Sequence, residues 1–127
     1  MSRTRRILLA EDDRELRIVL ARHLRLHGFE VTDVRDGTAA LARLGSEICK
    51  CGQSHYDLLI SDVHMPGHSG FDLACELRRS RWAMPVVLIT GFGSPEVHDT
   101  AERLHVALFD KPVNFAQLTH AIERLLD

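Results

Sequence analysis

Short apolar runs, separated by stretches with helical periodicity, organise the chain. Four of them cover residues 7–10, 58–61, 86–89 and 106–110, and such runs are typical of strands that are covered on both faces. A more polar run at residues 30–34 fits an edge strand. Strands that alternate with helices predict an α/β fold with a parallel sheet and helices on both of its faces.

The first two helices follow the first two strands. One is expected from about Asp13 to His27, with Gly28 as a left-handed cap at its end. Its apolar stripe consists of Leu16, Val19, Leu20 and Leu24. Asp36 is expected to cap the second helix, which carries Ala40, Leu41 and Leu44 and ends near Gly45. Residues 46–55 are then expected to form a loop.

Cap signals mark the remaining three helices. They are Ser69 with Asp72, Ser94 with Pro95, and Asn114 with Gln117. The stripe of the last helix consists of Phe115, Leu118, Ile122 and Leu125. Five strands and five helices with no linker predict a single domain over residues 1–127.

Composition narrows the class of protein. The chain has 127 residues, 45% of them hydrophobic, which is enough for one domain with its own core. A net charge of -2 gives no general attraction to nucleic acid or to an anionic membrane. No stretch approaches the roughly 20 apolar residues of a membrane span, and no signal peptide opens the chain. We therefore expect a cytoplasmic protein that does not itself bind DNA or RNA.

Three cysteines do not form a disulfide framework. Cys49 and Cys51 lie one residue apart with His55 nearby, which raises the hypothesis of a zinc site. A structural zinc site usually has four ligands in paired spacings, so a reduced, exposed loop is the competing interpretation.

Polar side chains follow the apolar strands at the points where the strands end. Glu11, Asp12 and Asp13 follow the first run, while Asp62, Thr90 and the Lys111-Pro112 pair follow the others. The carboxyl ends of parallel strands meet at one edge of the sheet, where ligands bind in such folds. Each residue also has an ordinary interpretation: Asp12 with Glu15 could be a helix cap, and Asp62 a turn residue. Their joint occurrence favours a site for a divalent cation and a phosphoryl group.

In order and spacing these motifs resemble the receiver domain of bacterial two-component response regulators. The resemblance runs from the acidic pair Glu11-Asp12, through Asp62 to Gly67 and Thr90-Gly91, to Lys111-Pro112. It implies a single doubly wound, flavodoxin-like domain with a five-stranded parallel sheet of order 2-1-3-4-5. It also implies a cis bond between Lys111 and Pro112.

The resemblance implies a role for each site residue. Asp12 and Asp62 would bind Mg²⁺ (or Mn²⁺) directly, Glu11 through water, and His64 through its backbone carbonyl. Asp62 would accept the phosphoryl group from a sensor histidine kinase or a histidine phosphotransfer protein. Thr90 and Lys111 would bind the phosphoryl oxygens.

Phosphorylation would then switch the face formed by the fourth helix, fifth strand and fifth helix. Dimerisation through that face stays open. The protein would not be an enzyme beyond catalysing its own phosphorylation and slow dephosphorylation.

The chain departs from the family pattern at two places. Residues 46–55 form a longer segment than usual before the third strand. The aromatic residue usually found three positions before the lysine is replaced by Leu108, unless a local shift puts Phe109 in its place.

Two other functions fit the sequence less well. A flavodoxin-like binder of a flavin or nucleotide would need a glycine-rich or hydroxyl-rich phosphate loop after the first strand. This chain has acids there, which repel phosphate unless a metal is present. A degenerate receiver that acts only as an interaction module is also less favoured, because all the core acids are present.

Overall fold

The computed structural model describes residues 4–48 and 56–127. Its strands are β1 (Arg6–Ala10), β2 (Glu30–Val34), β3 (Leu58–Asp62), β4 (Val86–Thr90) and β5 (Ala107–Asp110), all parallel and in the order β2-β1-β3-β4-β5. Its helices are α1 (Arg14–Leu26), α2 (Gly37–Ile48), α3 (Gly70–Arg79), α4 (Pro95–Arg103) and α5 (Phe115–Leu125). The predicted fold class and strand order are confirmed.

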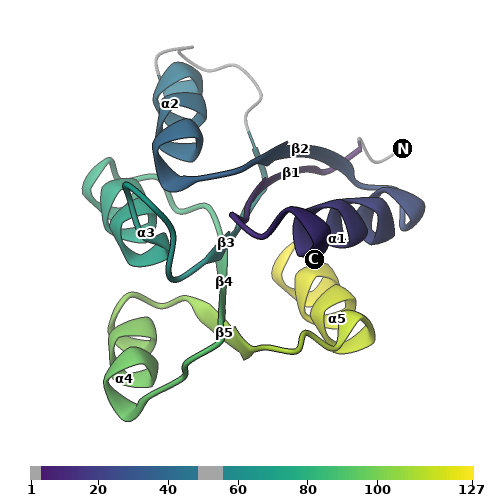
Figure 1. Cartoon of the computed structure of the whole chain (residues 1–127). Helices are drawn as coiled ribbons and strands as arrows, with labels where there is room; N and C mark the ends of the chain where they lie inside the picture. The colour runs from purple at the N-terminus through teal and green to yellow at the C-terminus, as the bar shows by residue number, and fades with distance from the viewer. Residues whose placement is uncertain (1–3, 49–55) are drawn as a thin grey trace.

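The helices cover both faces of the sheet (Figure 1). On one face α1 and α5 pack over a buried cluster that includes Leu24, Ile60 and Ile122. On the other face a cluster that includes Leu44, Leu59 and Leu73 joins the sheet to α2 and α3. Consecutive strand residues alternate between these clusters, so β1 and β3 are buried on both sides, as their continuous apolar sequences predict.

Most helix ends are where their cap signals place them. Ser69 and Asp72 form a reciprocal capping box at α3, Ser94 caps α4 and Asn114 caps α5. The backbone N–H of Ala39 donates to Asp36 Oδ1 at 2.7 Å, which confirms Asp36 at the start of α2. Gly28 has a φ of 91°, in the left-handed region that favours glycine.

One helix boundary differs from its prediction, and one alternative interpretation is excluded. The cap of α1 is Asp13, at the expected start of the helix, and its carboxylate accepts from the N–H groups of Glu15 and Leu16, so the alternative interpretation of Asp12 as the cap is wrong. Helix α2 continues through Gly45 to Ile48, which removes the first three residues of the expected loop. The proposed zinc ligands Cys49, Cys51 and His55 lie outside the described residues.

The predicted stripes of α1 and α5 each contain one residue that faces solvent. Val19 is 51% exposed and Leu125 is 41% exposed. Ala21 and Thr119 are buried instead, so each helix meets the sheet along a line slightly rotated from the predicted one. Among the described residues no helix has the length and apolar character needed to span a membrane.

Candidate functional site

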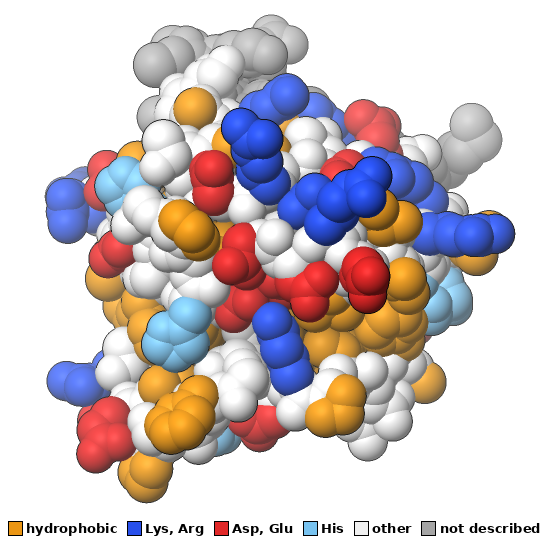
Figure 2. Space-filling model, viewed as in Figure 1, with side chains coloured by type: hydrophobic (Ala, Val, Ile, Leu, Met, Phe, Trp, Pro, Cys, Tyr) orange, Lys and Arg blue, Asp and Glu red, His pale blue; other side chains and the backbone are white. Residues whose placement is uncertain are grey.

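Three acidic side chains gather at the carboxyl edge of the sheet. Glu11 and Asp12 follow β1, and Asp62 ends β3, the strand beside it. One carboxylate oxygen from each lies within 4.8 Å of the others. Glu11 and Asp62 are buried and Asp12 is exposed. Figure 2 shows acidic side chains gathered near the middle of the face that it draws. The structure therefore brings the three predicted carboxylates into one cluster.

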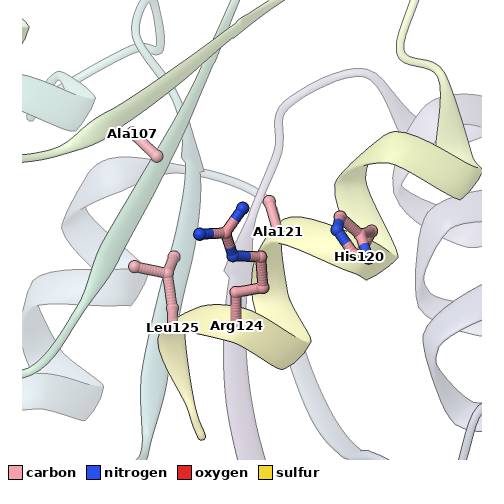
Figure 3. Close-up of a pocket in the computed structure, with 5 residues that line it drawn as sticks. All are labelled: Ala107, His120, Ala121, Arg124 and Leu125. Carbon is pink, nitrogen blue, oxygen red and sulfur yellow. The ribbon is translucent and has the colours of Figure 1, made fainter.

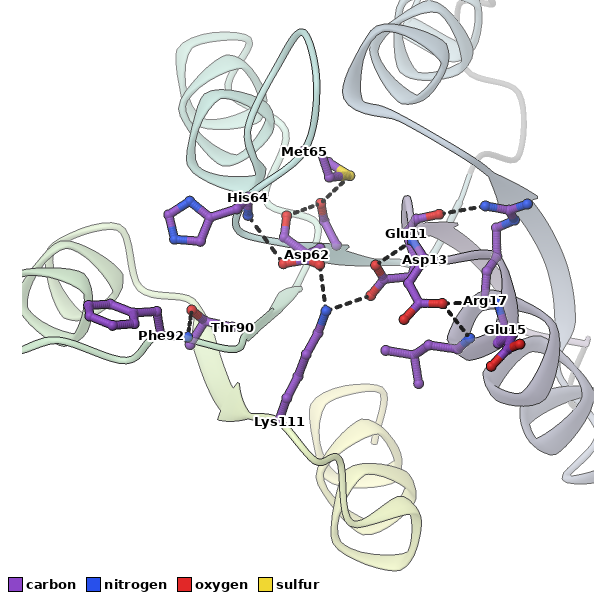
Figure 4. Close-up of polar contacts among 12 residues, drawn as sticks. Glu11, Asp13, Glu15, Arg17, Asp62, His64, Met65, Thr90, Phe92 and Lys111 are labelled. Atoms are coloured by element: carbon purple, nitrogen blue, oxygen red, sulfur yellow. Dashed lines mark hydrogen bonds and ion pairs between the residues drawn. The ribbon is translucent and has the colours of Figure 1, made fainter.

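Lys111 reaches this cluster from the end of β5 (Figure 4). Its Nζ donates a hydrogen bond of 2.7 Å to Asp62 Oδ2 and lies 3.5 Å from Glu11 Oε1. Burial opposes the charged ammonium, but the carboxylates of Asp62 and Glu11 outweigh it and raise the pKa of Lys111. Lys111 therefore stays charged and neutralises part of the cluster. The Lys111–Pro112 bond is cis, as expected.

Glu11 carries the largest electrostatic cost of the site. Burial, together with the nearby Asp62 carboxylate, raises its pKa from 4.5 to about 8, although the N–H of Asp13 donates to Oε2 at 3.1 Å and opposes the rise. Its Oε1 is buried and makes no hydrogen bond within the described part of the chain. A buried carboxylate oxygen without a donor is costly. One lysine cannot neutralise three carboxylates, so these residues fit a divalent cation with oxygen ligands.

The position of Asp62 is fixed by its backbone neighbours. The N–H of His64 donates to Asp62 Oδ1 at 3.2 Å, and the Ser61 hydroxyl donates to the Asp62 carbonyl at 2.9 Å. Gly70, the first residue of α3, packs directly on this carbonyl: a Cβ there would lie 2.6 Å from the carbonyl oxygen. The N-terminus of α3 and the end of β3 therefore form one rigid unit.

Thr90 ends β4, the next strand along the sheet, and is fully buried. Its hydroxyl accepts a hydrogen bond from the backbone N–H of Phe92 at 3.0 Å. The N–H of Lys111 donates to the Thr90 carbonyl at 2.8 Å. Thr90 is thus bonded both to the β4–α4 loop and to the residue that pairs with Asp62.

Comparison with known proteins identifies the family. Residues 7–123 match the response regulator receiver domain. The chain belongs to this family. It is 36% identical over 124 residues to the transcriptional regulatory protein TctD of Salmonella typhimurium, covering 95% of this chain and 51% of TctD. It is 31% identical over 123 residues to the response regulator receiver protein CpdR of Brucella abortus, covering 96% of this chain and 97% of CpdR.

The chain spans about half of TctD and only 6% of another curated relative. Among solved structures, it resembles the response regulator TrrA of Thermotoga maritima in complex with Mg²⁺-BeF. The TM-score is 0.80 with 27% sequence identity, over 97% of this chain and all of that one.

In this receiver domain the strand register shows which of Leu108 and Phe109 lies on the same sheet face as Thr90. Leu88 pairs with Leu108 and Thr90 with Asp110, so Leu108 lies on the sheet face toward which Thr90 also projects. Leu108 packs with the cluster under α2 and α3, whereas Phe109 packs with the α1 and α5 cluster on the opposite face. Leucine therefore occupies the position that is usually aromatic in receiver domains.

The receiver site also includes a residue that the sequence analysis missed. Arg17 of α1 donates from NH1 to the Glu11 carbonyl at 2.8 Å, and its Nε lies 3.6 Å from Asp33 Oδ2 on β2. The signal was present, because an arginine one helical turn after the cap Asp13 lies over the strand–helix turn. Only 15% of its side chain is exposed.

Proposed function

We propose that this receiver domain accepts a phosphoryl group on Asp62 and changes its output surface in response. One observation carries the proposal: Lys111 Nζ lies 2.7 Å from Asp62 Oδ2, beside two further carboxylates. Within the described residues this is the place where a nucleophilic carboxylate, a cation-binding cluster and a mobile positive charge coincide. The competing flavin or nucleotide binder is not favoured, because acids occupy the turn after β1 that would have to bind phosphate.

The cation that fits the cluster is Mg²⁺ or Mn²⁺. Asp12 and Asp62 would hold it directly, Glu11 through water, and His64 through its carbonyl. When bound, it would offset the repulsion among the carboxylates and neutralise charge on the phosphoryl oxygens. The TrrA structure in complex with Mg²⁺-BeF supports this choice.

Phosphorylation begins with attack of an Asp62 carboxylate oxygen on the phosphorus of a phosphohistidine. The O–P bond forms as the P–N bond breaks, and the departing imidazole nitrogen takes up a proton. Lys111 moves from the carboxylate to a phosphoryl oxygen, and the Thr90 hydroxyl turns to donate to another. In the unphosphorylated structure that hydroxyl accepts from the Phe92 N–H, so its rotation breaks this hydrogen bond and releases the start of the β4–α4 loop. Later attack by water on the phosphorus breaks the bond to Asp62, which restores the carboxylate and releases inorganic phosphate.

The partner that supplies the phosphoryl group would be a sensor histidine kinase or a histidine phosphotransfer protein in the cytoplasm. The surface that changes would be the face of α4, β5 and α5. On this face the small residues Ala107 and Ala121 leave a hollow beside His120, Arg124 and Leu125 (Figure 3). A second copy of the receiver or a downstream protein could bind there.

The test is phosphorylation by acetyl phosphate, followed by intact mass. With Mg²⁺ the wild type should gain the mass of one phosphoryl group, and with EDTA it should not. Asp62→Asn should gain nothing. Glu30→Gln is the matched control, because it removes an exposed carboxylate at the first residue of β2, at the edge of the sheet opposite the cluster, and it should react like the wild type. Modification of Asp62→Asn to the same extent would contradict the proposal.

A further inference from the structure

Arg17 is the cationic side chain that bridges the acidic turn and the edge strand. Its guanidinium donates to the Glu11 carbonyl at one end and pairs with Asp33 at the other. Only 15% of the side chain is exposed, so it has little freedom to leave this position.

Asp33 holds a second arginine of the same helix. Arg25 NH2 lies 3.1 Å from Asp33 Oδ1 and also donates to the Val31 carbonyl at 2.9 Å. Both arginines therefore tie α1 to β2 through one carboxylate. They differ in what else they touch, since Arg25 reaches an edge-strand carbonyl and Arg17 reaches the acidic turn.

The contact of Arg17 fixes one peptide unit of the site. The N–H of Glu11 donates to the Val34 carbonyl at 3.1 Å, and the carbonyl of Glu11 accepts from Arg17. That carbonyl belongs to the peptide unit that joins Glu11 to Asp12. Asp12 is exposed, so packing does not fix its side chain, and the orientation of this peptide unit sets the direction in which its Cα–Cβ bond leaves the backbone.

We infer that Arg17, held by Asp33, is a positioning residue that aims Asp12 at the cation. The inference rests on the proposed function, because it concerns the cation site. The inference also predicts that loss of Arg17 changes cation affinity in the direction opposite to the one that simple electrostatics predicts. Removing a positive charge near a cation site should strengthen cation binding, whereas loss of a positioning residue should weaken it.

The experiment measures cation affinity directly on the intact chain. Mn²⁺ is titrated and its free fraction followed by electron paramagnetic resonance, and Mg²⁺ affinity is then obtained by competition. Arg17→Gln should weaken Mg²⁺ binding about tenfold or more, the range found when groups that orient metal ligands are removed. Arg25→Gln is the matched control, with the same charge change and the same lost pair to Asp33, and should stay within about twofold of the wild type.

Each outcome of this experiment either supports or overturns the inference. An Arg17→Gln protein that binds Mg²⁺ as well as the wild type or more tightly overturns the inference, and so does equal weakening in Arg25→Gln. If Arg17→Gln does not fold by circular dichroism, Arg17→Lys replaces it. Lysine cannot serve the carbonyl and Asp33 together, so weaker binding than in Arg25→Gln supports the inference and wild-type binding overturns it. A wild type that binds neither ion would contradict the proposed function itself.

Discussion

Replacing Glu11 with glutamine should stabilise the metal-free protein at high pH. The pKa of Glu11 is about 8 in the folded protein against the usual 4.5, so the folded state holds this proton more tightly than the unfolded chain does. The stabilisation from the protonated side chain is complete below pH 4.5 and is lost as the pH rises to about 8. Glutamine copies the shape of the protonated acid and does not titrate.

The magnitude follows from the two pKa values. They differ by roughly 3.5, and each unit corresponds to about 1.4 kcal/mol. The upper limit is therefore roughly 5 kcal/mol of stability lost by the wild type across this range but kept by Glu11→Gln. That is a large share of the 5–15 kcal/mol typical of a folded domain. The carboxylate is only 1% exposed, so solvent screens it little.

Urea unfolding in EDTA measures this effect, with fluorescence of Trp82 as the signal because it is the chain's one tryptophan. The free energies of unfolding of the wild type and Glu11→Gln should be close near pH 5, diverge as the pH rises to about 8, and keep a nearly constant difference from there to pH 9. Saturating Mg²⁺ should stabilise the wild type more than the variant. If the free energies of unfolding of the two proteins differ by the same amount at pH 5 and at pH 9, the reasoning is refuted.

Four further predictions concern single residues. Lys111→Met should slow phosphorylation by acetyl phosphate roughly 100-fold in an intact-mass time course, because the charge 2.7 Å from Asp62 is lost; a wild-type rate would contradict its role. Gly70→Ala should cost about 1–3 kcal/mol in urea unfolding because its Cβ would press on the Asp62 carbonyl. Gly45→Ala, where a Cβ meets nothing within 4 Å, should instead stabilise the helix by up to about 1 kcal/mol. His23 has its pKa lowered by burial and by His27, so its stabilisation is present above pH 6.5 and lost as the pH falls below it. His23→Gln should make unfolding free energies less sensitive to acid, and an unchanged pH dependence would contradict this.

The sequence predicts the strands and caps well because their signals are local. A continuous apolar run reports burial on both faces, and a capping side chain acts within three residues of itself. The helix stripes are predicted less well, because the line of contact depends on the partner element. Thr119 is buried and bonds to His23 across the α1–α5 contact at 2.8 Å, whereas Leu125 on the same helix is exposed. Hydrophobicity alone cannot reveal that a threonine takes a buried position.

The three consecutive acids show why the site could be predicted from the sequence, whereas the role of each acid within it could not. Asp12 and Asp13 are equally good caps by sequence, and the structure uses Asp13, so the Asp12 carboxylate is left for the cluster. The N–H of Asp13 meanwhile donates to Glu11, so one residue both starts α1 and steadies a buried carboxylate. Glu11 raises the energy of the metal-free fold, and stability alone would favour a neutral residue there. A bound divalent cation would offset that energy, so the buried acid fits a cation site, and the pH dependence of Glu11→Gln measures the energy that the cation would offset.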